Sequence, residues 1–248
     1  MKILLTSGGT KVPIDRVRSI TNMSRGTFGA KIARQIFLCG DPNTRLTYLG
    51  AAEFRTPFST QINFAQEEFA PAFMRGAHLY EEYLRCQDRY FEQTYKTFEQ
   101  YQVALSDLLQ LGGFDVVILA AAVSDYLVAN QVDGKIRSSE EWNIELEPAP
   151  KLIKIIKEIC PKTHLVGFKL LVDSTKAQLI EAAKKSIVEN GCSFVVANDL
   201  RDIKAGEHKL LIVSQPDPEN FRVEEYHTDT QDPEHLARVV AEKVLKLE

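Results

Sequence analysis

The apolar positions of this 248-residue chain form short runs separated by amphipathic stretches. The runs predict strands at 2–6, 45–50, 114–122, 163–169 and 193–198. Helical periodicity covers 29–39, 65–110, 149–160, 174–190 and 232–247. The run FDVVILAAA at 114–122 is nearly continuous, which is typical of a strand buried on both faces of a parallel sheet. The alternation predicts an α/β protein with a doubly wound, Rossmann-like, mostly parallel sheet that carries helices on both faces.

Two segments break this rhythm. Residues 65–110 are rich in Glu, Gln, Tyr and Phe and have no glycine after Gly76, which predicts a helical insertion. Its aromatic residues suit either packing on its own domain or a contact between two copies. Residues 207–227 read HKLLIVS and FRVEEYH around PDPEN, which predicts an antiparallel hairpin at one edge of the sheet. We expect residues 1–248 to form a single domain that includes both segments.

The connection between the first predicted strand and the first helix, residues 7–29, is unusually long. Strand–helix connections in such folds commonly need two to six residues. The glycines in this connection, Gly8, Gly9, Gly26 and Gly29, permit close approach of a ligand, and the free N–H groups of a helix start favour an anion. There is no G-K-[ST] motif and no complete G-x-G-x-x-G motif. The connection therefore predicts a phosphate-binding loop of another type, with a long structural turn as the alternative.

Two side chains in this connection are candidates for chemistry. Arg18 is suited to bind a carboxylate or phosphate through two nitrogens, or to pair with Asp15 at the surface. Asn22 is suited to donate to a developing negative charge, or to cap the helix that follows.

A second group of candidates follows the third predicted strand, in AAAVSDY at 120–126. The small side chains of Ala121 and Ala122 leave room for a ligand, or allow close contact with a helix. Asp125 is placed to accept hydrogen bonds or to hold Mg²⁺ through water. Lys135, in GKI, suits an anionic group, although a solvated lysine is the alternative.

Composition narrows the classes of partner. The net charge of -4 and the pI of about 5.8 argue against a nucleic-acid-binding protein. Four cysteines without a C-x-x-C pair argue against a zinc or redox site. The N-terminal apolar run is too short for a signal peptide, and no apolar run has the length of a membrane span. We therefore expect a cytoplasmic protein that binds neither nucleic acid nor membrane.

The motifs SGGT, PID.VR.ITN.S.G..G, AAAVSDY, GKI, GFK and VAND occur in this order and cover nearly the whole chain except most of 65–110. In this the chain resembles the phosphopantothenate–cysteine ligase (phosphopantothenoylcysteine synthetase) family, in its monofunctional form. The resemblance implies a reaction of coenzyme A biosynthesis. CTP or ATP, with Mg²⁺, would convert 4'-phosphopantothenate to an acyl-nucleotidylate with loss of pyrophosphate, and L-cysteine would then displace the nucleoside monophosphate. It also implies a homodimer in which an arm reaches the partner's site, and the 207–227 hairpin is our candidate for that arm.

The resemblance, together with the local chemistry, selects the site residues. Asn22 and Lys135 are the expected catalytic residues, Asn22 in the conversion of the acyl intermediate and Lys135 in stabilising charge during activation. The expected nucleotide-binding residues are Ser24, Gly26, Gly29, Asp125, Lys135, Ala149, Pro150, Phe168, Lys185 and Asn198. The expected substrate-binding residues are Arg18, Asn22, Ala121 and Ala122. Position alone would place Phe168 in the core, whereas the resemblance places it beside the base.

Departures from the family pattern leave the nucleotide open between CTP and ATP, with a slight preference for CTP being accepted. They include Ser24-Arg25, Thr27-Phe28 and Glu189, where some relatives carry a second lysine. One alternative is an NAD(P)-dependent oxidoreductase, but the second strand is followed only by Glu53 and the glycines come late. A non-catalytic nucleotide-binding protein on the same fold would be expected to have lost Asn22, Asp125 or Lys135. We therefore predict a ligase.

Overall fold

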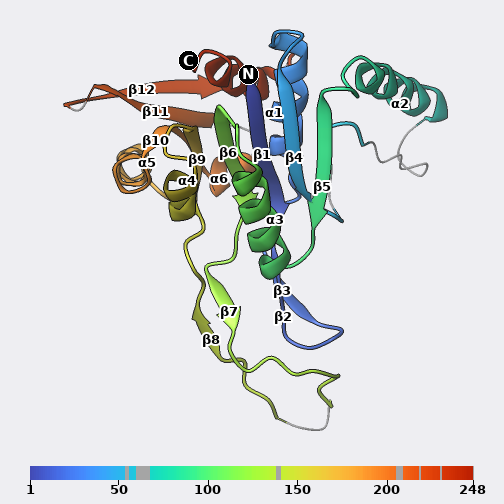
Figure 1. The fold of residues 1–248 in the computed structure, drawn as a ribbon, viewed down its shortest axis with the longest axis vertical. Coiled ribbons are helices and arrows are strands. Elements are labelled where there is room, and N and C mark those ends of the chain that lie inside the picture. Colours follow the sequence, from blue (N-terminus) through green and yellow to red (C-terminus); the bar gives the residue numbers. More distant parts are fainter. Residues whose placement is uncertain are drawn as a thin grey trace.

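The computed structural model describes residues 1–53, 56–59, 68–137, 141–204, 209–217, 219–229 and 231–247. Its main sheet has the strand order β12-β11-β10-β9-β6-β1-β4-β5 (Figure 1). These strands are β1 (Lys2–Gly9), β4 (Arg45–Ala51), β5 (Tyr90–Tyr95), β6 (Val116–Ala122), β9 (His164–Leu171), β10 (Cys192–Asp199), β11 (Lys209–Asp217) and β12 (Asn220–His227). The first six are parallel, and β11 and β12 add an antiparallel hairpin at one edge. The predicted mostly parallel sheet with an edge hairpin is confirmed.

Helices cover both faces of this sheet because its central strands are apolar on both sides. In β1, Ile3 and Leu5 point into one core cluster and Leu4 points into the other, and all three are fully buried. The helices α1 (Thr27–Cys39) and α7 (His235–Val244) cover the face of Ile3. The helices α3 (Phe98–Leu111), α4 (Ile153–Ile159) and α5 (Lys176–Asn190) cover the face of Leu4. The predicted doubly wound arrangement is thus confirmed.

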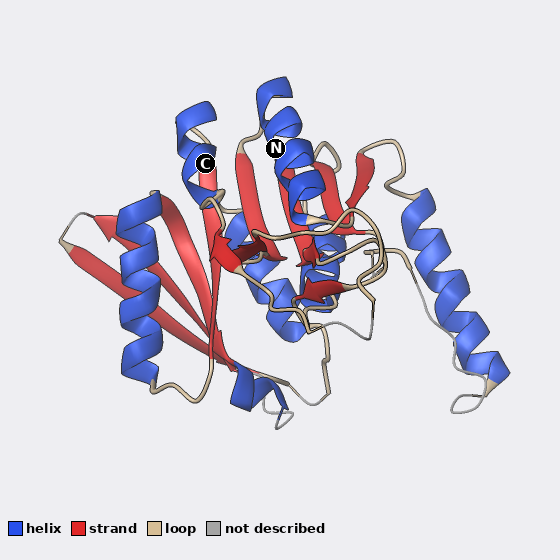
Figure 2. Ribbon diagram, turned by 90° about the horizontal axis from the view of Figure 1, so that it is seen from below, coloured by secondary structure: helices blue, strands red, loops and turns tan. Residues whose placement is uncertain are grey.

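The prediction of a helical insertion at 65–110 is wrong for residues 90–95, which form a strand of the main sheet. The segment contains α2 (Phe69–Leu84), then β5, which pairs in parallel with β4, and then α3. An edge strand such as β5 is exposed over most of its length, so its polar residues give no alternating signal, and pairing with β4 overrides local propensity. Only α2 lies away from the sheet, beyond its β5 edge, in both Figure 1 and Figure 2. Residues 65–67, 207–208 and Pro218 of the two predicted segments lie outside the described residues.

The α3 helix is part of the core and begins with a strong local signal. The side chain of Thr97 accepts from the backbone N–H of Gln100, and the Gln100 side chain accepts from the backbone N–H of Thr97. This capping box satisfies two backbone donors that the helix leaves free. Further along the helix, Tyr101, Leu105 and Leu109 are almost completely buried.

Two short hairpins at the carboxyl edge of the sheet were not predicted. The first pairs β2 (Lys11–Pro13) with β3 (Ser19–Thr21), and the second pairs β7 (Tyr126–Val128) with β8 (Leu146–Pro148). Both project from the edge at which the parallel strands end (Figure 1). Strands of three residues are too short to produce a periodic pattern. A short α6 (Leu200–Lys204) follows β10.

No helix within the described ranges combines the length and the hydropathy that crossing a bilayer requires.

Replacing Leu105 by Ala tests whether α3 is a core helix. Leu105 is fully buried, so we expect the free energy of unfolding to fall by roughly 2–5 kcal/mol in chemical denaturation. Val103 lies on the same helix with 59% of its surface exposed, so Val103→Ala should change the same quantity by about 0.5 kcal/mol or less. Equal losses in the two variants would contradict this assignment of the helix.

Candidate functional site

The centre of the carboxyl edge lies between β1 and β6. After β1 the chain crosses to β4 on one side, and after β6 it crosses to β9 on the other side. Such a switch point is where ligands bind in open α/β sheets. The register pairs Gly8 with Ala121 and Gly9 with Ala122, so the two predicted loops leave the sheet side by side. Ala121 and Ala122 are half-buried at this point.

The first turn of α1 lies directly on the end of β1. The Ser7 hydroxyl donates to the Gly26 carbonyl at 3.0 Å, and a Cβ on Gly29 would overlap the Ser7 side chain. Gly26 is the residue before the helix and has a φ of 71°, a conformation that glycine adopts without strain. The close packing of α1 on β1 therefore needs glycine at both positions.

The start of α1 is suited to an anion. The structure gives it no side-chain cap and no acidic residue in its first turn. The N–H groups of this turn have no acceptor within the helix, and the helix dipole makes this end positive. Ser24 lies beside it and accepts from the Gly26 N–H at 3.4 Å. Three of the predicted phosphate-binding residues, Ser24, Gly26 and Gly29, are thus brought together.

Asn22 connects the two loops of the switch point. Its Nδ2 donates to the Ala122 carbonyl at 2.7 Å and lies 3.4 Å from the Ser124 hydroxyl. Ser124 in turn donates its backbone N–H to the Thr10 hydroxyl at 2.9 Å. The alternative that Asn22 caps α1 is wrong, because the residue at the cap is Gly26. The amide is instead fixed beside the carboxyl end of β6.

Asp125, Ala149 and Pro150 lie together at the base of the β7–β8 hairpin. The Ala149 N–H donates to the Asp125 carbonyl at 2.9 Å, and Lys151 forms an ion pair with the Asp125 carboxylate at 2.6 Å. Both partners are well exposed, with 71% of the Asp125 side chain accessible. This carboxylate is available to a ligand at the carboxyl edge, because the exposed Lys151 can move aside at little energetic expense.

Phe168 is half-buried near the end of β9 and packs against the core cluster on the α1 side. Its ring meets that of Phe28 edge to face, with centroids 6.3 Å apart. The position-based prediction of a core residue and the resemblance-based prediction of a ligand residue are both compatible with this half-buried place. From the sequence Phe28 was named only as a departure from the family pattern, and the tertiary contact is what places it beside Phe168.

Arg18 and Lys135 lie on two connections that meet. The Arg18 guanidinium donates to the Asp15 carboxylate at 3.0 Å and to the Ile136 carbonyl at 2.9 Å. Asp15 is fully buried, so its pairing with Arg18 is not the surface contact that the sequence offered as the alternative. The hydrogen bond from Arg18 holds the pKa of Asp15 well below its usual range. Lys135 is exposed and its ammonium has no hydrogen bond or ion pair within the part of the chain that the structure describes.

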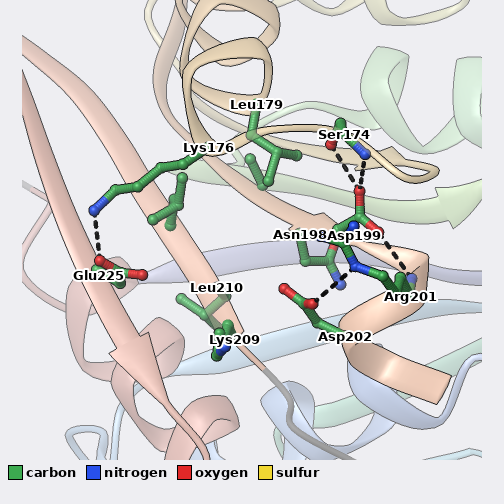
Figure 3. A pocket seen from close by; sticks show the side chains of 12 residues that line it. Ser174, Lys176, Leu179, Asn198, Asp199, Arg201, Asp202, Lys209, Leu210 and Glu225 are labelled. Carbon is green, nitrogen blue, oxygen red and sulfur yellow. Dashed lines mark hydrogen bonds and ion pairs between the residues drawn. The ribbon is translucent and has the colours of Figure 1, made fainter. Parts of the chain in front are cut away.

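Asn198 lies at the end of β10 and lines a cavity of about 210 Å³ (Figure 3). The cavity is bounded by the start of α5, by α6 and by the β11–β12 hairpin, and Lys176 pairs with Glu225 across its side. Lys185 does not line it. That side chain is exposed, lies about 9 Å along the axis of α5 from Leu179, the nearest lining residue of that helix, and is 3.7 Å from Glu189. The structure therefore separates two residues that were predicted to share a ligand.

Asp199, beside Asn198, was not predicted as a site residue. It is 1% exposed and accepts from the Ser174 hydroxyl and N–H, each at 2.7 Å, and from the Arg201 N–H at 2.8 Å. The hydrogen bonds from Ser174 and then Arg201 lower the pKa of Asp199 to about 2. Asp173, the residue before Ser174, has a backbone φ of 49°, which residues other than glycine rarely adopt. The carboxylate therefore fixes a strained loop at the cavity mouth.

No group of three or more His, Cys, Asp or Glu side chains within the described ranges could hold a metal by itself. Asp125 supplies one exposed carboxylate. Magnesium commonly takes one or two carboxylates together with substrate phosphates, so this donor set fits a metal that is carried by a triphosphate.

Comparison with known proteins places this geometry in a family. The sequence model described as the DNA/pantothenate metabolism flavoprotein C-terminal domain matches residues 1–58 and 96–247. The chain belongs to this family. The match includes α3 and omits 59–95, the range that contains α2 and β5.

Relatives and solved structures agree with the match. The phosphopantothenate–cysteine ligase of Homo sapiens is 29% identical over 95% of this chain and 86% of the relative. A coenzyme A biosynthesis bifunctional protein of Thermococcus kodakarensis is 34% identical over 86% of this chain, which spans only 45% of that relative. The DNA/pantothenate metabolism flavoprotein from Streptococcus pneumoniae has a TM-score of 0.73 at 27% identity, with 98% of both chains covered. A Cab2 mutant in complex with phosphopantothenate-cysteine shares the fold, with a TM-score of 0.78 at 23% identity over 98% of this chain and 86% of that one.

Asp199→Asn should make stability depend on pH in a defined direction. The folded-state pKa of about 2 lies below the ordinary value of 3.8, so the stabilisation is complete above about pH 5 and is lost as the pH falls toward 2. The difference in unfolding free energy between wild type and Asp199→Asn should therefore shrink over this range. Asn198→Ala is the control, because an amide does not titrate and its difference from wild type should stay constant. A constant difference for Asp199→Asn would contradict the role given to the carboxylate.

Proposed function

We propose that this chain is a phosphopantothenate–cysteine ligase that makes 4'-phosphopantothenoylcysteine in coenzyme A biosynthesis. The observation that carries the proposal is that Asn22 and the uncapped start of α1 both lie at the β1–β6 switch point, in a chain that aligns over 95% of its length with a ligase of that name. An NAD(P)-dependent oxidoreductase is not favoured, since no relative reported above carries such a name. A non-catalytic binding protein is not favoured either, since Asn22, Asp125 and Lys135 are all retained.

The first step activates a carboxylate. A carboxylate oxygen of 4'-phosphopantothenate attacks the α-phosphorus of the nucleoside triphosphate, and the bond from that phosphorus to the bridging oxygen breaks, which releases pyrophosphate. Two anions must approach each other and a third must leave. In this proposal the N–H groups of α1 and the ammonium of Lys135 stabilise the charge, and Gly26 and Gly29 allow the phosphates to come close.

The second step forms the amide. The amine of L-cysteine attacks the acyl carbon, the bond to the nucleotide oxygen breaks, and the amine loses a proton. An oxyanion develops on the acyl oxygen during the attack. Asn22 is our candidate donor, because one N–H is held by the Ala122 carbonyl while Ser124 engages its Nδ2 only at 3.4 Å. Arg18, Ala121 and Ala122 are the proposed contacts of the phosphopantothenate.

The nucleotide is CTP or ATP in this proposal, bound through Asp125, Ala149, Pro150, Phe168, Lys185 and Asn198 in addition to the α1 start. The edge-to-face pair of Phe168 and Phe28 offers a surface beside the base. Lys185 is the weakest member of the set, because of its distance along α5 from the cavity. Magnesium, when bound through the phosphates and Asp125, would neutralise charge on the triphosphate.

We also propose a homodimer with the β11–β12 hairpin as the arm toward the partner. The hairpin forms one edge of the sheet and leaves Val223 38% exposed on β12. An edge strand of this kind has unpaired backbone groups that suit contact with a second chain. Sedimentation equilibrium checks the assembly, and a fully active monomer would rule it out.

A direct assay tests the function. The purified protein is incubated with Mg²⁺, 4'-phosphopantothenate and L-cysteine, with CTP and ATP in parallel reactions. We expect release of pyrophosphate and a product with the mass of 4'-phosphopantothenoylcysteine with at least one nucleotide. Folded protein that yields neither product nor pyrophosphate with both nucleotides would favour the non-catalytic binding protein.

Two variants should separate the two steps. Lys135→Ala should slow pyrophosphate release roughly 10²-fold, because a cation is lost where charge develops. Asn22→Asp should release pyrophosphate but accumulate the acyl-nucleotidylate, because the new side chain cannot donate to the oxyanion; rapid quench with mass detection would reveal it. Lys154→Ala, an exposed lysine of α4, is the matched control and should leave both steps unchanged. Wild-type rates in both site variants would show that the site is misplaced.

A further inference from the structure

The segment that carries Lys135 has no helix or strand of its own. The described residues 131–137 are bends and irregular backbone between the two strands of the β7–β8 hairpin. A long exposed side chain on such a segment would sample many positions unless the backbone were held from outside. The backbone at Lys135 can therefore be fixed only by contacts with other parts of the fold.

Those contacts come from one place, the turn between β2 and β3. The Val132 N–H donates to the Ile14 carbonyl at 3.1 Å, and the Arg16 N–H donates to the Gly134 carbonyl at 2.9 Å. The Ile136 N–H donates to the Asp15 carboxylate at 3.1 Å. The Arg18 guanidinium also donates to the Ile136 carbonyl. Backbone polar groups on both sides of Lys135 are therefore held by hydrogen bonds.

Asp15 is the centre of this junction. Its Oδ1 accepts from the Val17 and Arg18 N–H groups, each at 2.8 Å. Its Oδ2 accepts from the Arg18 Nε at 3.0 Å and from the Ile136 N–H. One carboxylate thus shapes the β2–β3 turn with one oxygen and attaches the Lys135 segment with the other. A buried carboxylate with this many donors stays ionised, and removing its charge leaves several donors without an acceptor.

The β2–β3 turn is itself anchored at the switch point between β1 and β6. The strand β3 leads from Arg18 to Asn22, whose amide is bound to the Ala122 carbonyl. Thr10, just before β2, donates its N–H to the same Ala122 carbonyl at 3.2 Å. A continuous set of hydrogen bonds therefore joins the carboxyl end of β6, the β2–β3 turn and the backbone at Lys135.

We propose that Asp15 is a positioning residue that presents Lys135 to the nucleotide during carboxylate activation, a role that rests on the proposed function. Asp15 touches neither substrate nor the reacting atoms. Its effect is to hold the ammonium near one place before the substrates bind, which reduces the loss of conformational freedom in the reaction.

A double-mutant cycle tests the proposal. Pyrophosphate release is measured in a single turnover without cysteine for wild type, Asp15→Asn, Lys135→Ala and the double variant. We expect Asp15→Asn to slow this step roughly 10- to 100-fold in the wild-type background and less than about 3-fold in the Lys135→Ala background, since the residue it serves is already absent. Independent, multiplying losses would overturn the proposal and point to a role through Arg18 or through the fold.

A second measurement does not depend on activity. Hydrogen exchange of the Ile136 amide reports directly on its bond to Asp15, and we expect Asp15→Asn to accelerate it at least about 10-fold. Asp133→Asn is the matched control. It removes an equally negative side chain from the same segment, but that side chain is 84% exposed and, among the residues that the structure describes, pairs only with Arg16, so neither exchange nor activation should change. Unchanged exchange in folded Asp15→Asn would overturn the anchoring.

Asp15→Glu covers the case in which Asp15→Asn does not fold. It keeps the charge and moves the carboxylate by one methylene, so we expect a smaller loss of the same activation step and a smaller acceleration of exchange at Ile136. Wild-type values of both in Asp15→Glu would count against the proposal. Absence of pyrophosphate from the wild-type protein itself would instead overturn the proposed function, while the exchange measurement would still decide the anchoring.

Discussion

The parallel pairing of β1 with β6 is the constraint on which the site depends. Because Gly8 lies opposite Ala121 and Gly9 opposite Ala122, the loops after these strands begin at the same height beside each other. Small residues at these positions leave the edge open, and the close approach of α1 to Ser7 brings a positive helix end to the opening. Asn22 then joins the two loops through the Ala122 carbonyl. Each of these features would be lost if the register shifted by one residue.

Beyond the sheet, buried carboxylates take over the task of fixing the chain. Asp15 organises the β2–β3 turn and the Lys135 segment, and Asp199 organises the loop before α5 and the start of α6. Both accept backbone N–H groups and both have a lowered pKa. Irregular loops have backbone donors that no ladder satisfies, and a buried carboxylate can satisfy several at once. The positions of loop residues at the carboxyl edge are thus set by charge-assisted hydrogen bonds.

Features set by residues close together in the sequence could be predicted, whereas features set by contacts between distant residues could not. The strands β1, β6 and β10 were recognisable, because burial on both faces leaves an apolar run, and the hairpin was recognisable from its turn residues. The strand β5 was not, since an edge strand needs little apolar surface. Asp15 stands three residues before Arg18 and so suggested a local ion pair. The same carboxylate also accepts from the Ile136 N–H, 121 residues away, and no local pattern contains that contact.

A strand outside the residues of the family match also bears on the site. Residues 59–95 lie outside the family match, yet they end in β5, whose last residue Tyr95 is buried and donates its hydroxyl to the Ser7 carbonyl at 2.9 Å. Ser7 is the residue on which the start of α1 rests. On the next element, Tyr101 lies 3.2 Å from the Thr6 hydroxyl, and burial raises the pKa of Tyr101 to about 12, so it remains a neutral hydrogen-bonding group. The two rings contact each other with centroids 4.9 Å apart. The strand β5 therefore supports the end of β1, and a change at Tyr95 would reach the start of α1 through Ser7.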